Sequence, residues 1–344
     1  MSRTLQWGIL GTGNIAGTFA EGLAGSTTGK LVAVGSRQRD SAERFGGRFN
    51  VPHVHDSYEA LLADPQVEAV YISLPHPMHA EWAIKVARAG KHILCEKPIA
   101  VNHSDAAAII EAARSNDVFL MEAFMYRCHP QTTKLVELIR NKAIGDVRVI
   151  HAAFSFHAAF DASHRAFNHE LGGGGILDVG CYPVSMARLV AGVAMGRDFA
   201  EPIDVQGAGH IGKVSRVDEW AIASLRFPGD IVAQVATGVS VNQENVVRIF
   251  GSEGNILIPS PWLPSRNGGV STIILQRNAS SQPEEIRIEE TKGLYSIEAD
   301  TVAAHIDRRQ APSPAMTWED TLGNMKTLDR WRASIGLRYD GESA

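Results

Sequence analysis

The fold of this chain is decided by the stretch Gln6-Trp7-Gly8-Ile9-Leu10-Gly11-Thr12-Gly13-Asn14-Ile15-Ala16. An apolar strand runs directly into the pattern Gly-x-Gly-x-x-Ala, where a helical pattern begins. This is the turn that binds a dinucleotide: the first glycine makes the tight turn, the second lets the pyrophosphate approach the backbone, and Ala16 allows close helix–strand packing. The helix N-terminus then faces the anion. We therefore expect a dinucleotide to be bound by Gly11, Thr12, Gly13, Asn14 and Ile15.

Short apolar runs alternate with helical patterns over residues 5–121, which predicts an α/β fold. Several runs are apolar throughout, as expected of parallel strands covered on both faces. We expect strands at 6–10, 31–36, 69–73, 92–96 and 118–121, and helices at 15–24, 40–49, 57–62, 79–89 and 104–115. Residues 1–123 are therefore predicted to form a Rossmann domain with a doubly wound parallel sheet.

After residue 123 the pattern changes to short strands separated by turns. For residues 124–344 we expect an α+β domain with a largely antiparallel sheet. Its strands are expected at 147–157, 204–210, 220–227, 231–241, 246–250, 255–258, 272–276 and 285–289, and its helices at 176–190, 295–308 and 318–333. A length of 344 residues also favours two domains.

The composition is that of an ordinary globular protein, with 44% hydrophobic and 21% charged residues. The net charge of −5 gives no indication of binding to nucleic acid or to an anionic membrane. No run approaches the ~18 continuous apolar residues of a membrane span, and the first residues lack the apolar core of a signal peptide. The 3 cysteines have no CxxC spacing. We expect a cytoplasmic protein.

The end of the second predicted strand bears on the choice of dinucleotide. An acidic residue there would bind the ribose 2′-hydroxyl of NAD. This chain has Ser36 and Arg37 instead, and Arg37 is suited to pair with a 2′-phosphate. We expect NADP. NAD stays open as the alternative, because Arg37 as a solvated loop charge would leave the preference undecided.

Two further segments lie at the ends of predicted strands, where open α/β sheets bind ligands. The first is rich in proline and histidine, and Leu74, His76 and His79 are its candidate cofactor contacts. The alternative is a rigid turn in which His79 starts a helix. The second is Glu96-Lys97-Pro98, where the proline restricts the backbone and so the direction of the Lys97 ammonium. We expect Glu96 and Lys97 to lie at the cofactor as well.

The segment 171–182 contains four consecutive glycines followed by the start of a helix. The glycines allow a ligand to approach the backbone closely, and Asp178 and Tyr182 are spaced to share one helix face. Hydride transfer to or from a carbinol needs a proton donor or acceptor, and a tyrosine can serve if a nearby cation lowers its pKa from about 10. We expect Tyr182 to be this acid/base, Lys97 the cation and Asp178 the orienting group. Taken singly, Asp178 is equally a helix-start charge and Tyr182 a half-buried aromatic.

Together these motifs resemble the glucose–fructose oxidoreductase, inositol dehydrogenase and MocA family. The resemblance extends over essentially the whole chain and rests on Gly11-x-Gly13-x-x-Ala16, Glu96-Lys97-Pro98, Met125-Tyr126-Arg127-x-His129-Pro130 and Gly173-Gly174-Gly175-x-x-Asp178-x-Gly180-x-Tyr182. It implies that Lys97 is the family's catalytic lysine and Asp178 its acid. It also implies that residues 124–344 form a substrate-binding and oligomerisation domain with an open, mostly antiparallel sheet. A homodimer or homotetramer is expected to form through that sheet.

One departure narrows the resemblance. Tyr182 stands where inositol dehydrogenase-like members carry histidine, so the chain resembles the tyrosine branch, with dimeric dihydrodiol dehydrogenase and NADP-dependent sugar dehydrogenases and ketosugar reductases. Arg165 matches an arginine near the cofactor, although His164 replaces the usual tryptophan. We expect an NADP-dependent oxidoreductase acting on a secondary or anomeric hydroxyl, or the ketone, of a sugar or polyol. A trans-dihydrodiol dehydrogenase and a non-catalytic nucleotide sensor are the alternatives.

Histidines are frequent between residues 151 and 169. His151, His157, His164 and His169 lie there, together with Asp161. Their spacing fits no metal motif, so we expect no metal site. We expect some of them to hydrogen-bond substrate hydroxyls instead.

Overall fold

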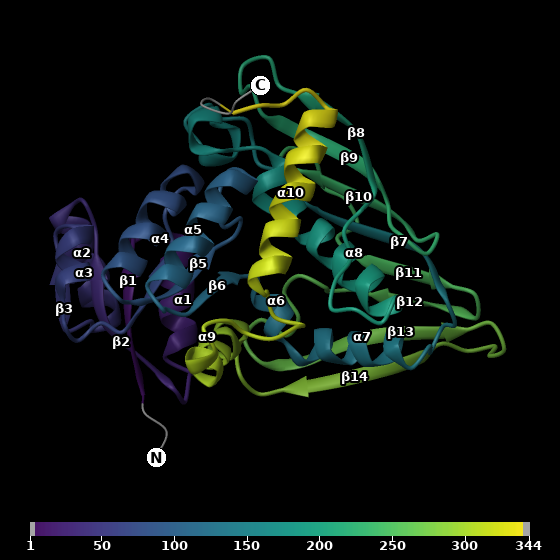
Figure 1. Cartoon of the computed structure of the whole chain (residues 1–344), viewed down its shortest axis with the longest axis horizontal. Helices are drawn as coiled ribbons and strands as arrows, with labels where there is room; N and C mark the ends of the chain where they lie inside the picture. Colours follow the sequence, from purple (N-terminus) through teal and green to yellow (C-terminus); the bar gives the residue numbers. More distant parts are fainter. Residues whose placement is uncertain (1–3, 340–344) are drawn as a thin grey trace.

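The chain forms two sheets with helices packed on both (Figure 1). The computed structural model describes residues 4–339. The first sheet is parallel throughout, in the order β3-β2-β1-β4-β5-β6. Its strands are β1 (Leu5–Leu10), β2 (Gly29–Gly35), β3 (His53–His55), β4 (Ala69–Ile72), β5 (His92–Glu96) and β6 (Leu120–Ala123). The strand order reverses beside β1, at the switch point where doubly wound sheets bind ligands.

Helices connect these strands: α1 (Asn14–Leu23), α2 (Arg39–Phe49), α3 (Tyr58–Ala63), α4 (His79–Arg88) and α5 (His103–Ser115). The strands β4 and β6 are buried at every position, as expected of parallel strands covered on both faces, and Glu122 is the one charged residue in them. The Rossmann prediction is confirmed. The prediction omitted β3, because three residues at the sheet edge carry no apolar run.

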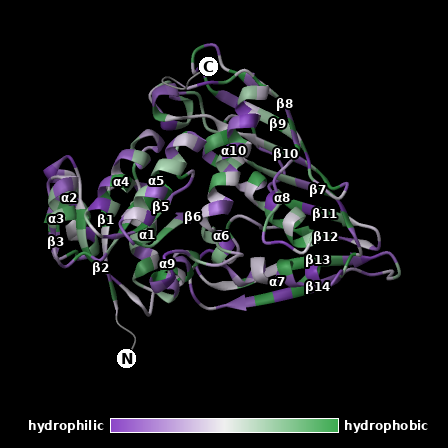
Figure 2. Cartoon of the chain, in the orientation of Figure 1, coloured by the Kyte–Doolittle hydropathy of each residue, from purple (hydrophilic) through white to green (hydrophobic). Residues whose placement is uncertain are grey.

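The second sheet has the order β14-β13-β12-β11-β7-β10-β9-β8, in which only β7 and β10 pair in parallel. Its strands are β7 (Val147–Ser155), β8 (Asp204–Ile211), β9 (Asp218–Arg226), β10 (Val232–Gly238), β11 (Val247–Gly251), β12 (Gly254–Ile258), β13 (Gly269–Arg277) and β14 (Glu284–Glu290). Buried and exposed residues alternate along β9, as in a sheet covered on one face. The edge strand β14 carries mostly hydrophilic residues (Figure 2), which discourages pairing with another sheet. The predicted α+β class is confirmed.

The covered face of this sheet packs on helices, of which α8 (Cys181–Ala194) is the most buried. The stretch His169–Ala194 contains an 18-residue window with a mean hydropathy of 1.4 and is long enough for a membrane span. Its apolar window is entirely buried inside the fold, which is typical of a core helix.

The last helices connect the two halves of the chain. The helix α9 (Leu294–His305) packs on α1, and α10 (Trp318–Ser334) packs on α5 and α8. The approach of α9 is close, since a Cβ atom at Gly22 would lie 2.4 Å from the Cβ atom of Tyr295. Two short helices that we did not predict, α6 (Met125–Cys128) and α7 (Pro130–Arg140), follow β6 directly. The domain boundary at residue 123 stays a prediction.

Candidate active site

The glycine turn after β1 has the properties that an anion requires. Gly11 has a φ of +100°, and a Cβ atom there would lie 3.0 Å from the Ser73 hydroxyl, so only glycine fits. A Cβ atom at Gly13 would meet no atom within 4 Å, so the space beside it is open. The first turn of α1 contains no acidic residue and no side-chain cap, which leaves its N–H groups available to a phosphate. The turn therefore fits a pyrophosphate, and the exposed or half-exposed Thr12, Asn14 and Ile15 lie within it.

Ser36 and Arg37 follow β2 at the same edge of the sheet. Ser36 is buried, and its amide donates to the carbonyl of His55 on the neighbouring strand, at 3.2 Å. Arg37 is exposed and interacts with the phenol of Tyr58, where its charge opposes the increase in pKa that burial causes. No acidic side chain stands at either position, so a 2′-phosphate would meet no carboxylate from these residues.

The segment after β4 contains two buried histidines, His76 and His79, which make different contacts. His76 is buried, and its Nδ1 donates to the carbonyl of Gly172 at 3.1 Å, which joins the loop to the glycine segment. Burial lowers the pKa of His76 to about 3, so the ring is neutral. His79 is fully buried, with Nδ1 2.9 Å from the carbonyl of Pro98 and Nε2 2.7 Å from that of Leu74. The ring of His79 therefore links two loops and offers no free nitrogen to a cofactor.

Lys97 extends from the end of β5 toward the start of α8. Its Nζ donates to the Asp178 carbonyl at 2.7 Å and lies 3.5 Å from Asp178 Oδ1. Two buried acids support the strand ends: Glu96 accepts from the Tyr71 hydroxyl, and Glu122 Oε1 accepts from the Ile99 amide at 2.9 Å. Burial raises the pKa of Glu96, and it raises that of Glu122 to about 7.

The carboxylate of Asp178 contacts two cationic side chains. Arg165 Nη1 donates to Asp178 Oδ1 at 3.1 Å, and the Lys97 ammonium lies on the other side. Burial alone would raise the pKa of Asp178, but the charges of Lys97 and Arg165 outweigh it and hold the pKa below its usual range. Its second oxygen, Oδ2, is buried without a hydrogen-bond partner among the described residues. An ionised acceptor is therefore available to a ligand at this point.

Tyr182 lies beside Lys97 but in an apolar environment. The Lys97 Nζ is 5.3 Å from the centre of the Tyr182 ring, and the Tyr182 hydroxyl donates to Met125 Sδ at 3.5 Å. Our expectation that a cation lowers the pKa of Tyr182 is wrong for this structure, because burial raises it well above 10. The ring packs against four aromatic side chains, which explains the burial: Phe124, Tyr126, Phe154 and Trp262.

The four-glycine segment serves a different purpose from the one we expected. A Cβ atom at Gly173 would lie 2.6 Å from the Arg165 carbonyl, and one at Gly174 would lie 2.3 Å from Asp218 Oδ1. These glycines are therefore needed for close packing within the protein rather than for the approach of a ligand. Asp218, which we did not predict, accepts from the amide of Ile176 at 2.7 Å and so anchors the start of the helix.

The helix itself begins irregularly. Residues Ile176–Gly180 form a π turn before α8, a feature often found at functional sites. Pro183 in the next turn has no amide hydrogen, so one carbonyl of this segment loses its helical donor. In the same segment, the carbonyl of Asp178 accepts from Lys97 Nζ. The local irregularity thus connects α8 to the first sheet.

Residues from both halves of the chain thus meet at one place. Two family models match the chain: an oxidoreductase family with an NAD-binding Rossmann fold over residues 5–124, and the GFO/IDH/MocA C-terminal domain over residues 132–257. The chain belongs to the GFO/IDH/MocA family. It is therefore an NAD(P)-binding oxidoreductase, a dehydrogenase or reductase, as the sequence predicted.

Members of this family resemble the chain over most of its length. It is 36% identical over 265 residues to trans-1,2-dihydrobenzene-1,2-diol dehydrogenase of Mus musculus, which covers 76% of each chain. It is 33% identical over 252 residues to D-xylose 1-dehydrogenase (NADP(+)) 2 of Haloferax volcanii, covering 73% of this chain and 75% of that protein. The structure of the 3-ketoreductase KijD10 from Actinomadura kijaniata in complex with NADP and TDP-benzene superposes with a TM-score of 0.85 at 26% identity, covering 97% of this chain and 98% of that chain.

The structure brings together five of the predicted site residues: His76, Lys97, Arg165, Asp178 and Tyr182. The histidines between residues 151 and 169 do not gather there. His151 packs edge-on against Phe250, His164 accepts from the amide of Ala166, and the ring of His169 contacts the carbonyl of Arg338. Met125, the partner of Tyr182, was not predicted as a site residue, and only its place in the family motif could have indicated it.

Proposed function

We propose that this protein is an NADP-dependent oxidoreductase that interconverts a secondary or anomeric hydroxyl of a sugar or polyol and the corresponding carbonyl. The observation that carries the proposal is the contact of Lys97 with both Asp178 and the ring of Tyr182. It joins the ligand-binding edge of the first sheet to the first turns of α8. When bound, the nicotinamide supplies or accepts the hydride.

Tyr182 is proposed as the proton donor to the carbonyl oxygen that receives the hydride. Its pKa lies well above 10, so the phenol is protonated at neutral pH and is suited to act as an acid in reduction. Its present acceptor, the thioether of Met125, is weak. A substrate oxygen accepts more strongly, so rotation of the hydroxyl toward it is favourable.

Lys97 is proposed to bind the reacting oxygen and to stabilise negative charge there. Of its three N–H donors, one is used on the Asp178 carbonyl and one points to Asp178 Oδ1, which leaves the third for the substrate. Its charge also lies 5.3 Å from the centre of the Tyr182 ring and reduces the cost of a phenolate in the oxidative direction. Asp178, held by Arg165, orients the ammonium and keeps Oδ2 for a substrate hydroxyl.

The preference for NADP over NAD rests on Ser36 and Arg37. An exposed guanidinium at the end of β2 pairs with a 2′-phosphate, and no carboxylate at these two positions repels it. Two of the proteins that the chain resembles are named with NADP. Both observations support the same cofactor.

The second candidate, a trans-dihydrodiol dehydrogenase, is favoured by the aromatic surroundings of Tyr182. Phe154 and Trp262 stack at a ring distance of 5.7 Å, and each packs against Tyr182. Aromatic side chains of this kind bind either an aromatic diol or the apolar face of a sugar. The mouse dihydrodiol dehydrogenase is similar to this chain.

The test is a substrate screen that follows nicotinamide absorbance. Ketosugars, aldoses, polyols and trans-dihydrodiols are offered with NADP(H) and with NAD(H), and Lys97→Ala is assayed beside the wild type. We expect turnover of a sugar or polyol with NADP and a loss of about 10²-fold or more in the variant. Faster turnover of a dihydrodiol would favour the second candidate. NADP binding without any turnover would favour a nucleotide sensor and contradict the proposal.

We also propose that the uncovered face of the second sheet forms a homodimer or homotetramer. Trp220, Ile222 and Val232 on this face are each more than 40% exposed, and exposed apolar groups of this size mark contact surfaces. Light scattering of the wild type and of Trp220→Glu tests this proposal. A monomeric wild type contradicts it.

A further inference from the structure

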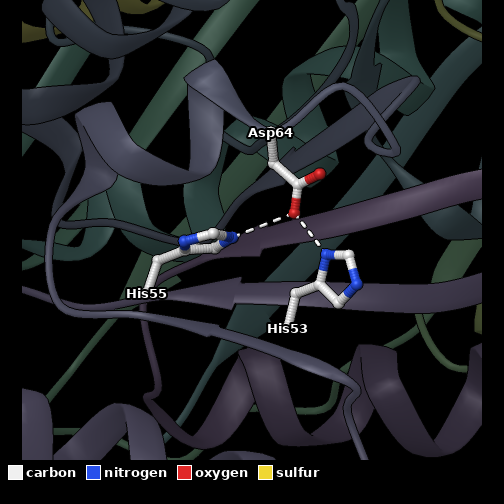
Figure 3. A group of neighbouring side chains, drawn as sticks. All are labelled: His53, His55 and Asp64. Carbon is white, nitrogen blue, oxygen red and sulfur yellow. Dashed lines mark hydrogen bonds and ion pairs between the residues drawn. The ribbon is translucent and has the colours of Figure 1, made fainter.

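Three side chains gather at the outer edge of the first sheet (Figure 3). His53 and His55 lie on β3, and Asp64 follows α3. His53 Nδ1 is 2.6 Å from Asp64 Oδ2, and His55 Nε2 is 3.0 Å from the same oxygen. Within residues 4–339 this is the one group of three or more His, Cys, Asp and Glu side chains whose ligand atoms lie within 4.8 Å of one another.

The local structure explains why the two rings point the same way. Alternate residues of a strand share a face, so the pattern His-x-His presents both imidazoles on one side of β3. This strand pairs with β2 alone, so the rings lie at the sheet edge, where their side chains are 31% and 21% exposed. An ion can therefore reach them from solvent.

Asp64 is fixed more firmly than either histidine. Its Oδ1 accepts from the Gln66 amide at 2.9 Å, and its carbonyl accepts from Lys91 Nζ at 2.8 Å. One oxygen of the carboxylate is thus held by the backbone, and the other, Oδ2, is turned toward the two rings. Metal-ligating carboxylates are held in the same way by outer hydrogen bonds.

We propose that His53 Nδ1, His55 Nε2 and Asp64 Oδ2 bind a divalent transition-metal ion of the Zn²⁺ class, with water as the fourth ligand. Two imidazoles and one carboxylate are a ligand set that zinc accepts. Bonds of about 2.0–2.2 Å in a tetrahedron place ligand atoms about 3.3 Å apart. The present separations from Oδ2 of 2.6 Å and 3.0 Å need to open by less than ~1 Å, which the partly exposed rings permit.

The position of the site indicates a structural rather than a catalytic metal. The strands β2, β1 and β4 lie between β3 and β5, which carries the Lys97 end of the active site. The carbonyl of His55 accepts from the amide of Ser36, at the edge where we expect the 2′-phosphate of NADP. The ion would join β3 to the loop after α3 and support the strand next to Ser36. This inference does not depend on the proposed reaction.

Zinc binding to the chelator-treated full chain is the test, measured by competition with a chromophoric chelator and by elemental analysis after dialysis. We expect one zinc per chain in the wild type. The double variant His53→Gln/His55→Gln removes two ligands, so its affinity falls by at least the 10–100-fold that even an outer partner contributes. The matched control, His151→Gln/His157→Gln, also removes two histidines outside the site and keeps the zinc.

Two further measurements distinguish the loss of the metal ligands from a folding defect in the variants. Circular dichroism in EDTA compares the melting of each variant with that of the wild type, and His55→Gln alone serves as the milder variant. Co²⁺ in the wild type should give the visible absorption of a four-coordinate site, and its intensity should fall as protons displace the metal from imidazole at low pH. The proposal is overturned if the wild type binds no zinc at micromolar concentration. It is also overturned if the double variant and the wild type bind zinc equally well, which would indicate adventitious binding elsewhere.

Discussion

Replacing Tyr182 by phenylalanine removes one hydroxyl group and leaves the ring in place. The one acceptor found for this hydroxyl among the described residues is the thioether of Met125, at 3.5 Å. A hydrogen bond to such a weak acceptor contributes less than about 1 kcal/mol to stability. The ring keeps its packing against Phe124, Phe154 and Trp262, so we expect the variant to fold and to melt close to the wild type.

The expected loss of activity is much larger. If Tyr182 supplies the proton, its removal costs about 10²–10⁴ in the rate of the chemical step. This corresponds to about 3–5 kcal/mol of activation free energy, several times the expected loss of stability. Because the phenol acts in the transition state, we expect kcat to fall and KM to change little. The pKa of Tyr182 lies well above 10, so the wild-type rate of reduction should not fall between neutral pH and pH 9 through loss of this proton.

Single-turnover oxidation of bound NADPH by the best substrate of the screen measures this step. Tyr126→Phe is the matched control, because it also loses a buried hydroxyl, bonded to Ser185 Oγ at 3.0 Å, and its ring lies 5.8 Å from that of Tyr182. We expect it to lose about 1 kcal/mol of stability and to keep nearly normal turnover. The reasoning is refuted if Tyr182→Phe keeps more than about a tenth of the wild-type rate, or if both variants lose activity equally.

Three further predictions concern stability and cofactor binding. Glu122 has a pKa raised from 4.5 to about 7 by burial, so it stabilises the fold below pH 4.5 and this contribution is lost as the pH rises through 7. In Glu122→Gln the side-chain amide can still hydrogen-bond both Ile99 and Thr321. The unfolding free energy of this variant relative to that of the wild type, measured in urea, should increase by about 2–3 kcal/mol from pH 5 to pH 8. The same difference at both pH values would contradict this. Arg37→Ala should raise KM for NADPH about 10–100-fold, because one charge-assisted contact to the 2′-phosphate is lost, and should leave KM for NADH nearly unchanged. An equal increase in KM for both cofactors would place Arg37 away from the phosphate. Gly13→Ala should melt like the wild type, because the added Cβ atom meets nothing within 4 Å. Its affinity for NADPH, measured by calorimetry, should fall by about 10-fold or more, because the Cβ atom occupies the space of the pyrophosphate. An unchanged affinity would place the pyrophosphate elsewhere.

Much of the fold could be predicted because its signals are local. The apolar runs of β1, β4 and β5 and the turn at Gly11 are readable from neighbouring residues alone. The strand β3 was missed because three residues, two of them histidines, carry no such run. Alternate positions put His53 and His55 on one face of β3, but their partner Asp64 is brought there by the turn after α3. The spacing of these residues along the chain does not predict that contact.

Lys97, Asp178 and Tyr182 were predicted to lie together, and the structure brings them together. Their catalytic roles stay predictions, and their protonation was not predicted correctly in every case. Asp178 and Lys97 were expected to meet, and they do, although the shorter contact of Lys97 Nζ is to the Asp178 backbone carbonyl rather than to its carboxylate. Tyr182 was expected to have a lowered pKa, but the four aromatic side chains that bury it come from three separate segments of the chain. Desolvation depends on all of them together, so it could not be derived from the neighbours of Tyr182 in sequence.

The sequence by itself determined the Rossmann sheet, the dinucleotide turn and the residue types at the site, because turn geometry and strand patterning depend on residues a few positions apart. Only the tertiary structure decided the protonation of Tyr182, the structural use of His79 and Gly174, and the gathering of His53, His55 and Asp64. These properties depend on burial and on contacts between segments distant in the chain. Burial sets the cost of a charge, and a contact exists only once both segments have been placed.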